Sequence, residues 1–146
     1  MIAVPGNNAS LRRRLLSLIY EALILAALLL AGALPAVFLT RAWDHALARP
    51  LLQVWLMLLC GVYYVWQWTG TGQTLPMKTW RLQLVANDGS PVTVVRAILR
   101  YLMAIAGTFL LGLGFLWALI DRDRRFLHDR LAGTRIVIKE GRAPAA

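Results

Sequence analysis

The sequence predicts an all-α membrane protein with two full transmembrane helices, a third apolar segment and a small cytoplasmic β element, in a single domain over residues 1–146. Hydrophobic residues make up 59% of the chain and charged residues 16%, whereas a soluble domain carries about 25% charged residues. Three segments reach about the 20 apolar residues that a bilayer core requires. This composition excludes a soluble enzyme with a polar surface, and the single Cys60 excludes an intrachain disulfide framework.

The first transmembrane helix is expected over residues 15–40, which contain an uncharged apolar run from 22 to 39. Arginines at 12–14 precede it, and basic flanks favour the cytoplasmic side. We therefore expect the N-terminus in the cytoplasm. A secretory signal has a similar basic start, but Glu21 and two later apolar segments argue against cleavage.

The second transmembrane helix is expected over residues 51–68, which carry only Gln53 and Gln67 as polar residues. Its tryptophans and tyrosines are typical of the headgroup level of a bilayer. The connection over residues 41–50 has a net charge of only +1, which suits the outer side. The second helix should therefore span back to the cytoplasm.

The loop over residues 69–96 is expected in the cytoplasm, because turn residues are frequent in it and basic residues exceed acidic ones. Within it, Thr79–Ala86 alternates between apolar and polar residues and is followed by Asp88-Gly89. Aspartate followed by glycine supplies the positive φ that a tight turn needs. We therefore expect a short strand at Thr79–Ala86.

The third apolar segment, residues 97–120, and the tail, residues 121–146, give conflicting indications. Three plain spans would place the tail outside, yet it contains seven basic and four acidic residues, a balance typical of the cytoplasm. Glycines within the segment favour a broken, re-entrant arrangement; the alternative is an ordinary third span. With a cytoplasmic tail, Thr134–Lys139 could form a second strand beside Thr79–Ala86.

Glu21 is the residue within the first helix most in need of an explanation. An ionised carboxylate at membrane depth costs on the order of 3 kcal/mol, so it should face protein or water and have a partner. We expect an arginine within ion-pair reach, from Arg14, Arg100 or the charged cluster at 122–130. One interpretation is a proton or cation site; the other is a structural ion pair.

The remaining charges suggest interfaces rather than catalysis. The chain has 16 Lys+Arg against 7 Asp+Glu, a net charge of +9, which here favours anionic lipid headgroups over nucleic acid because bases flank apolar segments. His128 and Asp129 are too few ligands to indicate a metal site. The sequence contains no nucleophile elbow, phosphate loop or dinucleotide fingerprint. We expect no enzyme activity, no cofactor and no metal.

Four stretches carry a resemblance to a known family: RRLLSLIYEALIL at 13–25, GQTLPMKTWRLQLV at 72–85, RAILRYL at 96–102 and GFLWALIDRDRRFLHDRLAGTRIV at 114–137. In this order they resemble the RDD family of small bacterial integral membrane proteins. The last stretch is the most specific, because HDRLAGT is the hallmark of the family.

The resemblance assigns candidate site residues. The family arginine corresponds to Arg13 or Arg14, and the aspartate of the first helix corresponds to Glu21, which keeps the charge on a longer side chain. The second aspartate best matches Asp129, with Asp121 as the alternative. A further departure is a proline where relatives usually have glycine, which affects how the local turn is built. The charged residues at family positions are Arg13, Arg14, Glu21, Asp121 and Asp129. Their candidate ion-pair partners are Arg100 and Arg130, and the proline is Pro76.

The resemblance implies a multi-pass protein of the bacterial inner membrane, and a few family members are associated with Na⁺/H⁺ exchange. Two functions remain open. The first is a non-catalytic scaffold or accessory subunit, whose partners are the lipid bilayer and either a second copy or another membrane protein. The second is ion or proton transport by an oligomer, with Glu21 and Asp129 as candidate ion sites. We favour the scaffold slightly, because no paired, interrupted repeats of the kind found in transporters are visible.

Overall fold

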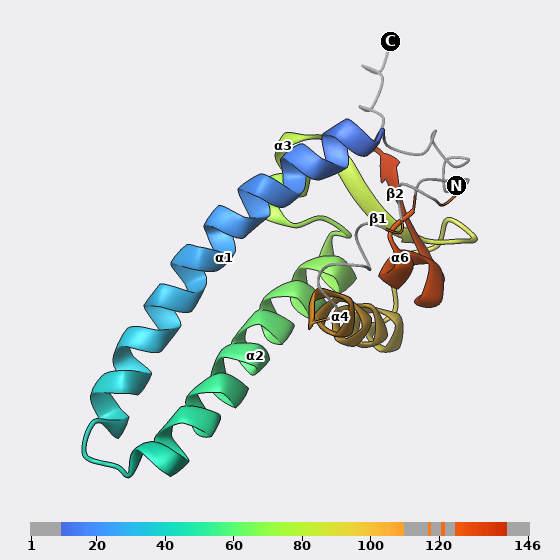
Figure 1. Ribbon diagram of the computed structural model, residues 1–146. Coiled ribbons are helices and arrows are strands. Elements are labelled where there is room, and N and C mark those ends of the chain that lie inside the picture. Colours follow the sequence, from blue (N-terminus) through green and yellow to red (C-terminus); the bar gives the residue numbers. More distant parts are fainter. Residues whose placement is uncertain (1–9, 110–116, 118–120, 122–124, 140–146) are drawn as a thin grey trace.

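The computed structural model describes residues 10–109, 117, 121 and 125–139. Two long helices, α1 (Leu11–Thr40) and α2 (His45–Gly70), run antiparallel and turn over at residues 41–44 (Figure 1). Both are long and apolar enough to cross a membrane. Many of their large apolar side chains are exposed, as expected where lipid rather than protein surrounds them. The prediction of two long apolar helices is confirmed.

The start of α2 differs from the prediction. The connection was expected to extend to residue 50, but α2 begins at His45 and contains Pro50 in its second turn. The side chain of Asp44 accepts a hydrogen bond from the backbone N–H of Ala46 at 3.1 Å and so caps the helix. Pro50 removes one intrahelical bond, the one that an N–H at this position would donate to the carbonyl of Ala46, so the helix continues through it to the cap at Asp44.

The predicted loop and tail form a folded unit at the open end of the helix hairpin (Figure 1). We call it the cap; it consists of α3 (Leu75–Thr79), β1 (Leu82–Ala86), α6 (Leu127–Leu131) and β2 (Thr134–Ile138). The two strands pair antiparallel, with Leu84 opposite Ile136. The predicted pairing is confirmed, but the first strand begins at Leu82 and not at Thr79, because Thr79 ends α3. The side of the membrane on which the strands lie stays a prediction.

Two glycines allow the backbone turns on either side of β1. Gly89 has a φ of +85° in the predicted turn after the strand, although that turn leads to a helix and not to the pairing strand. Gly72 has a φ of +69°, and its carbonyl accepts a hydrogen bond from the backbone N–H of Leu84 at 2.7 Å. A Cβ at Gly72 would lie 2.8 Å from the backbone oxygen of Leu84. Only glycine fits this approach without strain.

The proline that departs from the family pattern suits its position. Pro76 lies in the first turn of α3, where a missing N–H costs no intrahelical bond. Thr74 precedes the helix, and its hydroxyl accepts a hydrogen bond from the N–H of Met77 at 3.4 Å. The sequence Thr-Leu-Pro therefore starts this helix with an ordinary N-cap.

The apolar core lies between the cap and the ends of α2 and α4 (Val94–Phe109), not between the two long helices. It fixes the cap to the membrane helices, because each of these elements contributes side chains to it. The buried residues of this core are Trp68, Met77, Leu82, Leu84, Val92, Ala97 and Ile136.

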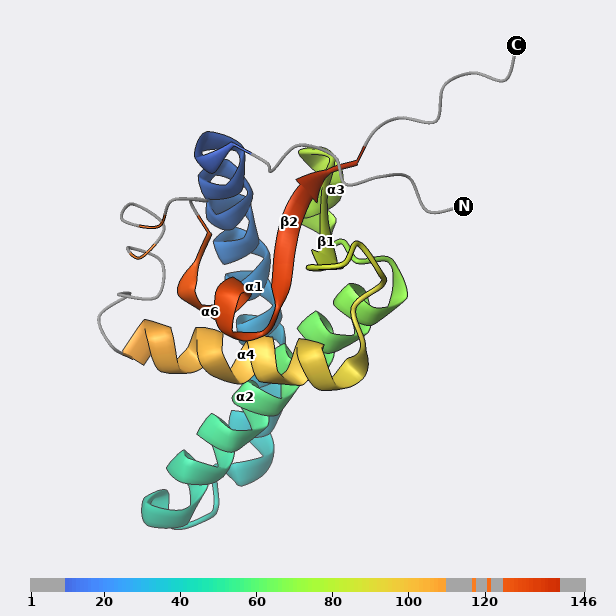
Figure 2. The same cartoon turned by 90° about the vertical axis from the view of Figure 1, so that its right-hand side faces the viewer.

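Helix α4 contains the first part of the predicted third apolar segment, but it begins at Val94 rather than at residue 97. It runs across α1 and α2 and not alongside them (Figure 2). Residues 110–116 and 118–120 of that segment lie outside the described residues, so its re-entrant course stays a prediction. Strand β2 nevertheless lies at the end of the hairpin where α1 begins, because Nη2 of Arg14 donates to the carbonyl of Ile136 at 3.1 Å.

Candidate functional site

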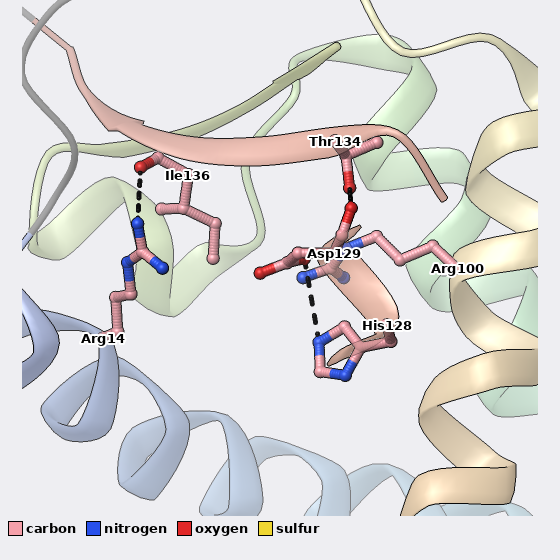
Figure 3. A network of polar contacts seen from close by, with 6 residues as sticks. All are labelled: Arg14, Arg100, His128, Asp129, Thr134 and Ile136. Carbon is pink, nitrogen blue, oxygen red and sulfur yellow. Dashed lines mark hydrogen bonds and ion pairs between the residues drawn. The ribbon is translucent and has the colours of Figure 1, made fainter. Parts of the chain in front are cut away.

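Polar and charged side chains are buried where α1, α4 and the cap meet, and Figure 3 shows the centre of this cluster. Burying a charged group without a partner costs free energy, so charged side chains in a protein interior are paired. The partners of these side chains therefore show which contacts hold this part of the fold together. The buried polar residues are Arg14, Ser17, Glu21, Gln73, Thr74, Arg100, Asp121, His128, Asp129 and Thr134.

Arg14 is the arginine of the first helix that faces the protein. Its neighbour Arg13 is exposed, whereas Arg14 is only 2% exposed and binds the carbonyl of Ile136 in β2. Successive residues on a helix point about 100° apart, so only one of two adjacent arginines can face the cap. Of the two alternatives from the resemblance, the structure therefore brings Arg14 into the cluster.

Arg100 and Asp129 form a buried ion pair between α4 and α6. Nε of Arg100 lies 2.7 Å from Oδ1 of Asp129, which is fully buried. The guanidinium also stacks over the ring of Trp68, 4.2 Å from its centroid, and the backbone carbonyl of Asp129 accepts a hydrogen bond from the hydroxyl of Thr134. The carboxylate lies between the side chains of Arg14 and Arg100 (Figure 3). Asp129 thus connects α4 to the cap.

Asp121, the alternative family aspartate, takes part in a more superficial arrangement. Oδ1 accepts from Nη1 of Arg130 at 2.5 Å, and Oδ2 accepts from the backbone N–H of Arg125 at 3.0 Å. The side chain of Arg130 is 61% exposed. An ion pair with one exposed partner contributes little to stability, at most about 1 kcal/mol. Asp129 is therefore the aspartate on which the packing of the cap depends.

Glu21 points into the protein as predicted. The prediction of an arginine partner is wrong for the described part of the chain, where the partners are hydroxyl groups. Oε1 accepts from the hydroxyl of Tyr63 at 3.0 Å and Oε2 from the hydroxyl of Thr74 at 2.5 Å; among the described residues Glu21 forms no ion pair. The arginines are used elsewhere: Arg14 binds β2 and Arg100 binds Asp129. Two hydroxyl donors therefore solvate the carboxylate.

The hydroxyl partners of Glu21 were missed by the sequence reasoning. Tyr63 lies on α2 and Thr74 at the start of α3, so neither is near Glu21 in the sequence. Tyr63 was interpreted as one of several headgroup aromatics. Thr74 carried a usable signal, since threonine two residues before a proline indicates a helix N-cap and hence a fixed side chain.

His128 is buried beside the ion pair, with Nε2 3.7 Å from Oδ1 of Asp129. Burial lowers the pKa of His128 to about 4; the carboxylate of Asp129 opposes this shift, and the guanidinium of Arg100 adds to it. The imidazole is therefore neutral at neutral pH. The positive charge that balances Asp129 comes from arginine and not from a protonated His128.

This pKa predicts a pH-dependent stability. The unfolded chain takes up a proton at His128 near pH 6.5, whereas the folded protein resists it until about pH 4, so acidification favours unfolding. Between pH 7.5 and pH 5 the free energy of unfolding should fall by about 2 kcal/mol more in the wild type than in His128→Gln. Thermal unfolding in detergent at the two pH values measures this difference. Identical pH slopes for both proteins would contradict a neutral buried His128.

A partly open cavity of about 630 Å³ lies between α1, α2, α4 and the cap. Glu21, Arg14, Arg100 and His128 line its polar end, whereas Asp129 does not line it. The described residues include no cluster of three or more His, Cys, Asp or Glu side chains that could hold a metal ion. The site therefore offers one hydroxyl-bound carboxylate, two guanidinium groups and an apolar chamber.

A family model described as "RDD family" matches residues 8–133 and so covers most of the chain. The matched region includes Arg14, Glu21, Arg100, Asp121 and Asp129. The resemblance drawn from the four sequence stretches is confirmed. No curated protein and no solved structure matches the chain.

Proposed function

The chain belongs to the RDD family, and we propose that it is a non-catalytic scaffold or accessory subunit of the bacterial inner membrane. The observation that carries the proposal is the buried ion pair of Arg100 and Asp129, together with the bond from Arg14 to Ile136. The charged residues at the family positions are engaged in holding α1, α4 and the cap together. Residues committed to internal contacts of this kind favour a structural role.

The cap is the surface that such a scaffold would present to a partner. It lies at the open end of the helix hairpin, and Lys78 and Arg81 are exposed on it. Rim charges of this kind select partners and speed their association more than they add affinity. We propose that the partner is a second copy of the chain or another membrane protein with an acidic surface.

The test is purification from native membranes after crosslinking, followed by mass spectrometry. A stoichiometric protein partner should be recovered with the wild type and largely lost with the double variant Lys78→Glu/Arg81→Glu. The matched control is Arg41→Glu, an exposed arginine at the opposite end of the hairpin, which should retain the partner. Recovery of the wild-type chain alone, with neither a partner nor a crosslinked second copy, would contradict the scaffold.

Ion or proton transport by an oligomer is the second candidate, and one observation favours it. Glu21 lines the cavity and, within the described residues, has hydroxyl partners in place of an arginine. Such a carboxylate can exchange a proton or a cation without breaking an ion pair. Asp129 is a weaker candidate ion site than Glu21, because it is fully buried and paired with Arg100.

For topology, we propose that both termini and the cap lie in the cytoplasm. The basic residues before α1 support this orientation, and the contact of Arg14 with Ile136 supports a shared side for the start of α1 and strand β2. In a Cys60→Ser background, a cysteine introduced at Ala42 should be labelled by an impermeant thiol reagent added to intact spheroplasts. A cysteine added after residue 146 should be labelled only after lysis. Labelling of the added C-terminal cysteine from outside would contradict the orientation.

A further inference from the structure

The cavity has two ends of opposite chemistry. Its polar end lies against the cap and contains the guanidinium groups of Arg14 and Arg100 beside Glu21. Its other end runs between the long helices and α4, where its walls are mainly apolar. Representative wall residues are Leu25, Leu29, Leu56, Met57, Ala104 and Ile105. A cavity that is charged at one end and apolar at the other is suited to an amphiphile.

The position of the apolar end favours a membrane lipid. Helix α2 packs against both α1 and α4, whereas contacts between α1 and α4 are few, which leaves a cleft between those two helices. The cleft lies beside the helices that would cross the bilayer, so acyl chains can enter it sideways without crossing water. Its volume of about 630 Å³ lies within the range of about 300–1,000 Å³ that is typical of small-molecule sites.

Arg100 supplies the headgroup contact. Its side chain is 8% exposed; Nε binds Asp129, and the plane of the group covers Trp68. Within the part of the chain that the structure describes, Nη1 and Nη2 of Arg100 make no hydrogen bond, and the residue lines the cavity. Two N–H donors held in a planar fork match two oxygens of a phosphate.

The balance of charges at the polar end leaves room for a phosphodiester. The cavity is lined by two guanidinium groups, from Arg14 and Arg100, against one carboxylate, Glu21. Both oxygens of Glu21 already accept hydroxyl hydrogen bonds, from Tyr63 and Thr74. Asp129 balances Arg100 from outside the cavity, so the four charges sum to zero, and the polar end suits a phosphate through the Nη1 and Nη2 donors of Arg100.

We propose that this cavity binds one membrane phospholipid, with its phosphate on the guanidinium of Arg100 and an acyl chain between α1, α2 and α4. The site is independent of the proposed scaffold role, because it requires no protein partner. Bound lipid would fill the cleft between α1 and α4 and place the phosphate at the level of the cap.

Cys60 provides a direct reporter of occupancy, since it is the single cysteine of the chain and lines the cavity. In delipidated full-length protein in detergent, dioleoyl phosphatidylglycerol should slow alkylation of Cys60 by a small apolar maleimide at least fivefold. Dioleoylglycerol has the same chains without the phosphate and should give less than twofold protection at equal concentration. Inorganic phosphate alone should give none.

Matched variants locate the site. Ala104→Trp fills the apolar end, whereas Ala106→Trp places the same side chain on an exposed face of the same helix. In native mass spectrometry, Ala104→Trp should lose the phosphatidylglycerol adduct at least tenfold, and Ala106→Trp should retain it.

Three results would overturn the proposal. Equal protection of Cys60 by dioleoylglycerol would show that the phosphate is not recognised. Equal adducts in the two tryptophan variants would place the lipid elsewhere. A Cys60 that is unreactive before lipid is added, and unchanged afterwards, would show that the chain itself fills the cavity.

Discussion

Asp129→Ala is expected to lower the free energy of unfolding by about 3–5 kcal/mol, the largest effect that we predict for a single substitution. The change leaves the guanidinium of Arg100 buried against Trp68 without its carboxylate partner. It also removes the charge that lies between Arg14 and Arg100 (Figure 3). Thermal unfolding in detergent, or the yield of monodisperse protein, measures the loss.

Two further variants separate the ion pair from general damage. Asp88→Ala removes an exposed carboxylate that hydrogen-bonds only to Ser90 among the described residues, and it should unfold close to the wild-type temperature. The double change Arg100→Met/Asp129→Leu should recover part of the lost stability, because it removes the buried guanidinium of Arg100 together with its carboxylate partner, whereas Arg14 still loses the nearby charge of Asp129. An Asp129→Ala protein that unfolds like the wild type would contradict the structural role of the pair.

Glu21→Ala is expected to have the second largest effect, about 2–4 kcal/mol, because it leaves the hydroxyl groups of Tyr63 and Thr74 without their acceptor. Glu21→Gln retains one acceptor oxygen and should cost only about 1 kcal/mol. The comparison uses thermal unfolding of both variants in the same detergent. Equal loss in Glu21→Ala and Glu21→Gln would show that charge matters here and hydrogen bonding does not.

The long helices could be predicted from the sequence because their signal is local. An uncharged apolar run of bilayer length identifies a helix without any knowledge of its neighbours. The start of α2 differs from the prediction because the helix continues through Pro50 to its cap at Asp44, whereas a proline in the sequence indicates the end of a connection.

The pairing of β1 with β2 was also predictable, since charge placed both segments on one side and few other segments had strand character. The hydrogen-bond partners of the buried charged residues were harder to predict. The acceptor of Arg14 is the backbone carbonyl of Ile136, and any residue type would supply that group. Likewise, the choice of hydroxyl groups over an arginine for Glu21 depends on where α2 and α3 bring Tyr63 and Thr74, which periodicity does not encode.

Proton flux in sealed proteoliposomes tests most directly whether the buried charges serve structure or transport. Wild-type protein and Glu21→Gln, both verified as folded, would be reconstituted with an internal pH indicator and exposed to a Na⁺ gradient. We expect neither protein to move protons faster than empty liposomes. Cation-dependent flux in the wild type that is absent from folded Glu21→Gln would contradict the scaffold and make Glu21 an ion site.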